Sequence, residues 1–108
     1  NKNMALELSF TSSHGVVASK AYHRIYKIVY NVRKSTSATA YAEVYYNSSA
    51  RTSNYAPIDV VQFDFVMDVK GSAKEPVTQA YNSLKTKSKV KNDRGATKSL
   101  DYSKAKDV

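Results

Sequence analysis

Residues 61–69, Val-Gln-Phe-Asp-Phe-Val-Met-Asp-Val, decide the fold class of this chain. Every odd-numbered position in the stretch is apolar, and positions 62, 64 and 68 are polar. Successive side chains of a β-strand point to opposite faces of its sheet. The stretch therefore predicts a strand with one face in the core and the other toward water. Gly71-Ser72 is expected to end it.

Downstream of this strand, the spacing of apolar residues changes from two to the period of a helix. The positions i, i+3, i+4 and i+7 from residue 77 are apolar, which is one face of a helix. Pro76 suits the first helical position, because its missing N–H would have no partner there. We therefore predict one helix over about residues 76–86, with an apolar face made of Val77, Ala80, Tyr81 and Leu84.

Upstream, three further strands are predicted, at about residues 5–12, 18–32 and 38–46. A turn at residues 12–15 separates the first two, with Gly15 free to adopt positive φ. The second strand exceeds the usual length of about 3–10 residues, so a bulge or bend is expected inside it. Residues 47–57 are predicted to be a long loop, a common place for contacts with partners.

Residues 87–108 lose all periodicity and are rich in Lys, Ser, Asp and Gly. We predict a basic tail that is disordered alone or extended on a neighbour, and dispensable for folding. The predicted fold is therefore α+β and mainly β: an antiparallel four-stranded sheet, or a small barrel or sandwich, with one C-terminal helix and an extended basic tail. The predicted division is a β-rich domain over residues 1–86 and the tail over residues 87–108.

The charge of the chain favours anionic partners. Its formal net charge is +8, and residues 85–108 hold eight Lys/Arg against three Asp. Such an excess suits nucleic acid or the acidic face of a protein. There is no cysteine, so disulfides and thiolate metal sites are excluded. No apolar run approaches the roughly 20 residues of a membrane span, so no membrane partner is expected.

Residues suited to catalysis are sparse. His14 is expected in a turn and His23 on the polar face of a strand, both at the surface. Asp64 and Asp68 share a strand face but are too far apart to share a proton, and Glu7 or Glu43 could join them only in some sheet orders. The chain has only three glycines, so a glycine-rich loop that binds a phosphate is not expected. We therefore expect a protein that is not an enzyme and needs no metal or cofactor.

Nine tyrosines are the most prominent side chains of the chain. Tyr22, Tyr26 and Tyr30 could form one stripe, and Tyr41 and Tyr45 a second. Aromatic stripes on a basic sheet can stack unpaired bases. They can also make a tyrosine-rich protein interface, or cross-strand pairs that only stabilise the sheet. All three interpretations remain open from the sequence.

The lysine-rich tail has equally distinct interpretations: it could bind phosphates, lie on an acidic neighbour, or be a solvated segment. From the tyrosines, their basic neighbours, the long loop and the tail we select the residues expected to contact a partner. They are Tyr22, Arg24, Tyr26, Tyr41, Tyr45, Arg51, Tyr55, Lys87, Lys89, Lys91, Arg94 and Tyr102.

Two stretches carry a resemblance to a known group of proteins. The first is LELSFTS at residues 6–12, followed by HGV at 14–16 and AYHRI at 21–25; the second is PVTQAYNSLKT at 76–86. Together they resemble small proteins encoded among the virion genes of tailed bacteriophages. Those proteins share a strand ending near a Gly turn, an AY-x-R-I/V strand and a P-x-x-QAY-x-x-LK helix. The lysine-rich extension departs from that layout, so the resemblance gives it no role.

The resemblance implies a structural subunit of a tail, baseplate, neck or capsid-decorating layer, located in the virion and assembled in the host bacterial cytoplasm. Its partners would be other virion proteins, in a homo-oligomer or symmetric assembly. The alternative function is a single-stranded nucleic-acid-binding module that uses the tyrosine stripes and basic residues.

Overall fold

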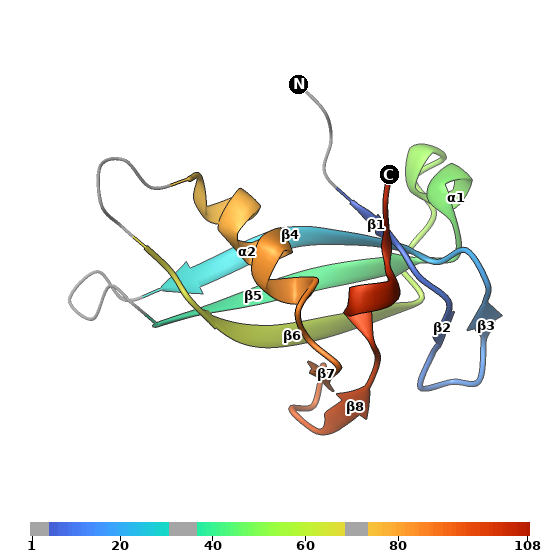
Figure 1. Cartoon of the computed structure of the whole chain (residues 1–108). Helices are drawn as coiled ribbons and strands as arrows, with labels where there is room; N and C mark the ends of the chain where they lie inside the picture. The colour runs from blue at the N-terminus through green and yellow to red at the C-terminus, as the bar shows by residue number, and fades with distance from the viewer. Residues whose placement is uncertain (1–4, 31–36, 69–73) are drawn as a thin grey trace.

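The computed structural model describes residues 5–30, 37–68 and 74–108 (Figure 1). These residues form a mainly β structure with two α-helices. In chain order the elements are β1 (Leu6–Glu7), β2 (Phe10–Thr11), β3 (Val17–Ala18), β4 (Tyr22–Tyr30), β5 (Ser37–Tyr45), α1 (Ser48–Thr52), β6 (Asp59–Val66), α2 (Pro76–Leu84), β7 (Lys89–Asn92), β8 (Thr97–Ser99), a 3₁₀ helix (Tyr102–Lys104) and β9 (Lys106–Asp107).

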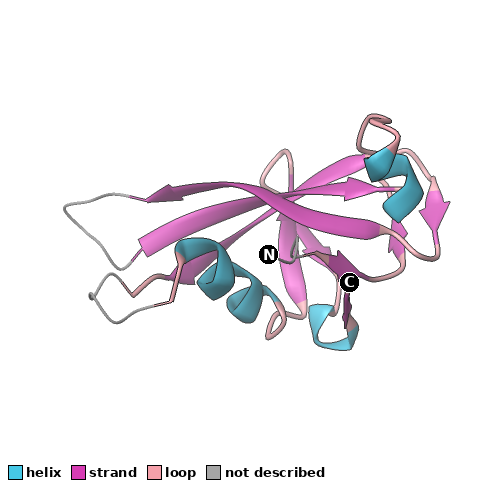
Figure 2. Ribbon diagram, turned by 90° about the horizontal axis from the view of Figure 1, so that it is seen from above, coloured by secondary structure: helices cyan, strands magenta, loops and turns pink. Residues whose placement is uncertain are grey.

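Seven strands form one antiparallel, strongly twisted sheet (Figure 2). Their order across the sheet is β8-β7-β6-β5-β4-β1-β9, and β2 and β3 pair separately as a hairpin. The strands β4, β5 and β6 are the long ones; β1 pairs with part of the β4 edge and β7 with part of the β6 edge, and β9 and β8 pair with β1 and β7. Segments from both ends of the described chain therefore extend a central three-stranded ribbon.

Helix α2 lies against one face of this ribbon, because β5 presents only small side chains there (Figure 1). Ala38 and Ala40 pair with Phe65 and Phe63, and side chains opposite one another across strands share a face. The alanines leave room for the helix, and the phenylalanines fill the space beside them. The core formed here includes Ala80, Tyr81 and Leu84 of α2.

The predicted four-stranded sheet with one helix and an extended tail is wrong. Beyond α2 the chain folds back and supplies β7, β8 and β9 to the main sheet. Val90 and Tyr102 are buried in the same core as the phenylalanines. The turn between β7 and β8 depends on Gly95, at φ 82°, and on Asn92, whose side-chain oxygen accepts from the N–H groups of Arg94 and Ala96. The lysines of this segment conceal short strands, of which β7 buries only Val90 and β8 and β9 bury no side chain.

Several predicted elements have different bounds in the structure. The strand expected at residues 5–12 is divided into β1 and β2, and the one at 18–32 into β3 and β4. The bulge expected in the latter is confirmed, because the β4–β5 register shifts between Ile25 and Lys27. The loop expected at 47–57 contains α1, capped by Asn47, whose side chain accepts from the N–H of Ala50. The ending expected at Gly71-Ser72 lies outside the described residues.

Two local predictions are confirmed. The predicted helix is α2, which begins at Pro76 and ends two residues earlier than expected. The predicted turn joins β2 to β3: Gly15 has φ 85°, and the hydroxyl oxygen of Ser12 accepts from the N–H groups of His14 and Val16. Both follow from chemistry that acts over a few residues, which is why the sequence shows it.

His23 contradicts the expectation that both histidines lie at the surface. His14 is exposed, but His23 is fully buried between β1, β2 and the 3₁₀ helix. Its Nε2 lies 2.9 Å from the carbonyl oxygen of Leu8, and its Nδ1 lies 2.8 Å from the hydroxyl of Tyr102. A carbonyl oxygen only accepts, so Nε2–H donates to Leu8 and Nδ1 accepts from Tyr102. Both ring nitrogens are thus satisfied inside the core.

Candidate interaction surfaces

We name the sheet face opposite α2 the outer face. The registers of β4, β5 and β6 place one set of side chains there, since directly paired residues share a face. Most of these side chains are partly or fully exposed. The set is Tyr22, Arg24, Lys27, Val29, Ser37, Thr39, Tyr41, Glu43, Tyr45, Val60, Gln62, Asp64 and Val66.

Aromatic rings and cations meet on the outer face. The rings of Tyr22 and Tyr45 pack edge to face with centroids 6.4 Å apart. Lys27 Nζ lies 4.9 Å from the ring centre of Tyr41, and the guanidinium of Arg51 lies 5.9 Å from that of Tyr45. These are cation–π distances. Four of the predicted contact residues, Tyr22, Arg24, Tyr41 and Tyr45, are therefore neighbours on one surface, and Arg51 reaches it from α1.

Tyr45 differs from the other residues of this surface, because it is only 8% exposed. Its hydroxyl donates to the carboxylate of Glu43 at 3.0 Å. Burial, and then the hydrogen bond to Glu43, hold its pKa above the ordinary value for tyrosine, so the hydroxyl keeps its proton. Tyr45 therefore packs beneath the outer face, and the partly exposed side chains of Tyr22 and Tyr41 are the ones that a partner could contact.

The bulge in β4 prevents the predicted stripe of Tyr22, Tyr26 and Tyr30. Tyr22 pairs with Tyr45 on the outer face, but Tyr30 pairs with Ala38, whose side chain lies on the helix side. Tyr26 is the extra residue of the bulge and lines a hollow of about 390 Å³ beside Pro76 at the start of α2. One inserted residue thus reverses which face each later side chain occupies.

The remaining predicted contact residues lie elsewhere. Tyr55 follows α1 and is 68% exposed. Arg94 is exposed in the turn between β7 and β8. Tyr102 is fully buried beside His23, so its side chain belongs to the core and offers no surface to a partner.

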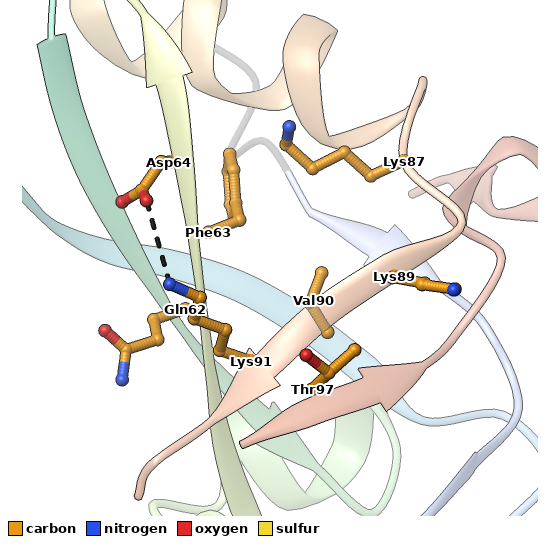
Figure 3. Close-up of a pocket in the computed structure, with 8 residues that line it drawn as sticks. All are labelled: Gln62, Phe63, Asp64, Lys87, Lys89, Val90, Lys91 and Thr97. Atoms are coloured by element: carbon orange, nitrogen blue, oxygen red, sulfur yellow. Dashed lines mark ion pairs between the residues drawn. The ribbon is translucent and has the colours of Figure 1, made fainter. Parts of the chain in front are cut away.

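The three tail lysines expected to bind a partner line one open hollow of about 300 Å³ (Figure 3). We name it the lysine notch; its walls are Gln62, Phe63, Asp64, Lys87, Lys89, Val90, Lys91 and Thr97. Lys87 Nζ lies 5.9 Å from the ring centre of Phe63, and Lys91 Nζ lies 3.9 Å from the carboxylate of Asp64. Lys89 points away from both (Figure 3).

Sequence reasoning missed Lys27 on the outer face and the β6 side of the lysine notch. The alternation of residues 61–69 already placed Gln62 and Asp64 on a solvent face, and this signal could have found them. The missing information was the neighbouring strand, because nothing in the sequence of residues 89–92 indicates that it pairs with residues 61–62.

Within residues 5–30, 37–68 and 74–108, no cluster of three or more His, Asp or Glu side chains could hold a metal ion. The same residues include no helix long and apolar enough to cross a membrane. No protein-family model matches the chain, and comparison with curated proteins and with solved structures finds no significant match.

Proposed function

We propose that this protein is a non-catalytic structural subunit that uses its outer face to bind neighbouring subunits of a larger assembly. The proposal rests chiefly on one observation: tyrosines and arginines gather on the sheet face opposite α2. Tyr and Arg are enriched at protein interfaces and dominate their energetics. Many copies of such a weak contact would add up to avidity in a symmetric assembly.

Exposed valines favour a protein partner on this face. Val29 and Val66 lie on the outer face and are 49% and 80% exposed. They extend the tyrosine-rich area with apolar surface that another protein can cover. The resemblance of residues 6–25 and 76–86 to virion proteins supports a bacteriophage particle as the assembly, with other virion proteins as partners and the virion as location.

The test is the solution mass of the purified protein, measured by light scattering over a range of concentrations at low and at high salt. We expect an oligomer that salt does not dissociate. Tyr41→Ala should shift it toward monomer, because Tyr41 lies at the centre of the outer face. Tyr30→Ala is the matched control, since Tyr30 is 45% exposed and lies on the opposite side of the sheet, whereas Tyr41 is partly exposed on the outer face.

A mass that equals the monomer at every concentration would contradict self-assembly through this face. Equal effects of Tyr41→Ala and Tyr30→Ala would place the interface elsewhere.

A single-stranded nucleic-acid-binding function is the second candidate. It is favoured by the cations held beside the outer-face tyrosines, Lys27 and Arg51, and by the net charge of +8. Phosphate binding weakens steeply with salt, whereas an apolar interface does not. A monomer that shifts onto oligothymidylate at low salt and releases it at high salt would favour this candidate over assembly.

A further inference from the structure

Beside the lysine notch, β6 has a stretch that pairs with no other described strand on that side. In β7, the N–H of Asn92 donates to Ala96, which shows that Asn92 faces β8. Backbone groups alternate direction along an antiparallel strand, so those of Lys91 face β6, where Lys91 pairs with Gln62. By the same alternation, the N–H and C=O groups of Asp64 and Val66 face the same edge as those of Gln62.

Asp68 is the next even-numbered residue along the chain, and its backbone groups already have a partner at that edge. The side-chain amide of Gln79 in α2 accepts from its N–H at 2.7 Å and donates to its carbonyl at 2.8 Å. The side chain of Gln79 thus makes the two hydrogen bonds that the backbone of a neighbouring strand would otherwise make. Between Gln62, paired with β7, and Asp68, held by Gln79, the described chain supplies no strand opposite Asp64 and Val66. Their four backbone groups form a short open edge.

At the opposite edge of the ribbon, α2 supplies a partner for one backbone group. The N–H of Ile25 in β4 donates to the hydroxyl of Tyr81 at 2.8 Å. Helix α2 therefore satisfies an edge group of the ribbon on each side. Asp64 and Val66 are both exposed, so their edge groups are accessible to a strand of another molecule.

We propose that the lysine notch binds an extended acidic peptide segment of a partner protein, which adds to the edge of β6 as a short strand. Its backbone would pair with Asp64 and Val66. Its acidic side chains would meet Lys91 and Lys87. Strand addition of this kind takes affinity from backbone hydrogen bonds and specificity from alternate side chains.

Charge and backbone together select a peptide over nucleic acid. Three lysines line the notch against one carboxylate, so the occupant should be acidic. A nucleic acid would satisfy the lysines but has no regular N–H and C=O pattern to match a strand edge. The proposed edge shares Asp64 and Val66 with the outer face, so the solution mass of Tyr41→Ala is measured beside peptide binding to tell the two proposals apart.

The probe is a fluorescein-labelled octapeptide that alternates glutamate with valine, titrated with the full-length protein and followed by anisotropy. We expect saturable binding that a lysine–valine peptide does not show. The same acidic peptide with N-methylated valines keeps its charge and loses backbone donors, so it should bind about tenfold more weakly. This comparison needs no protein variant and cannot be confused by misfolding.

Two variants locate the site. Val66→Pro removes an edge N–H at the exposed last residue of β6, where proline is tolerated, and should weaken binding about tenfold. Lys87→Glu with Lys91→Glu should do the same, whereas Lys20→Glu with Lys104→Glu, which changes charge equally at exposed positions elsewhere, should have a much smaller effect.

Three results would overturn the proposal: no binding of the acidic peptide, equal binding of its N-methylated form, or full competition by oligothymidylate. The first excludes the ligand class, and the second and third would show that charge alone attracts it. Because Asp64 and Val66 belong to both surfaces, the peptide titration is repeated with Tyr41→Ala, which distinguishes failure of peptide binding from occupation of the edge by a second copy of the chain.

Discussion

His23 connects three distant parts of the chain through one buried ring. Besides its hydrogen bonds to Leu8 and Tyr102, the ring packs edge to face on Phe10, with centroids 5.6 Å apart. Burial lowers the pKa of His23 to about 4, and the hydrogen bond to Leu8 only partly opposes this shift. The folded state therefore holds His23 neutral at neutral pH, and a proton on its ring favours unfolding.

The expected consequence is loss of stability in mild acid. Because the folded pKa lies below the unfolded value near 6.5, the folded protein resists protonation. Stability is then level above about pH 6.5 and falls as pH drops toward 4, by about 3 kcal/mol from this group. Urea unfolding of the wild type and of His23→Gln at several pH values measures it.

The variant should be less stable at neutral pH and should lose less stability on acidification. His14→Gln is the control, since His14 is exposed and should follow the wild type. A wild-type slope unchanged in His23→Gln would exclude His23 as the origin of the acid sensitivity.

The burial of His23 could not be predicted from its neighbours in sequence. Its partners are 15 and 79 residues away, and Tyr22 and His23 are about equally acceptable on either face of a strand. By contrast, the positive φ of Gly15 and the Asn92 turn follow from residue types that act locally. The difference is the sequence distance over which each side chain finds its partners.

At the scale of elements, the packing of α2 on the sheet provides the second test. Phe65 is buried under α2 in the same core as Leu84. Phe65→Ala should cost about 3–5 kcal/mol of unfolding free energy, because the β5 alanines opposite it cannot fill the cavity. Val66→Ala, the adjacent but exposed position, should change stability by less than about 0.5 kcal/mol. Denaturant unfolding compares the two, and a Phe65→Ala loss below about 1 kcal/mol would contradict the assigned face.

Elements whose apolar residues recur at the period of a strand or a helix could be predicted, and elements with few apolar residues could not. Strands β5 and β6 and helix α2 each bury three or more side chains, so their periods are visible in the sequence. Strand β7 buries only Val90, and β8 and β9 bury none. Lysines that keep their charged ends in water conceal such strands. The tyrosines and lysines of the candidate surfaces were predictable by type, but their grouping depends on the bulge and on β7.

For the whole molecule, the described tail residues are part of the fold, and this changes what their removal should do. Deletion of residues 88–108 would expose Phe10 and the β6 edge and leave His23 without Tyr102. We expect the shortened protein to lose its cooperative thermal transition, monitored by circular dichroism. Deletion of residues 105–108 removes β9 but keeps Tyr102, so it should retain a transition at a lower temperature. A wild-type transition after the longer deletion would show that residues 1–87 fold independently.

The pairing of β1 with β9 also has a consequence for the time at which the molecule folds. Leu6 pairs with Asp107, so one edge of the main sheet joins residues synthesised at opposite ends of the described chain. Contacts so distant in sequence form slowly, because a long loop must close first. While the last residues remain inside the ribosome, β1 lacks its outer neighbour and His23 lacks Tyr102. Completion of the sheet therefore has to wait until residues 102–107 have left the ribosome, and until then its unpaired strands would depend on chaperones or fast burial to avoid aggregation.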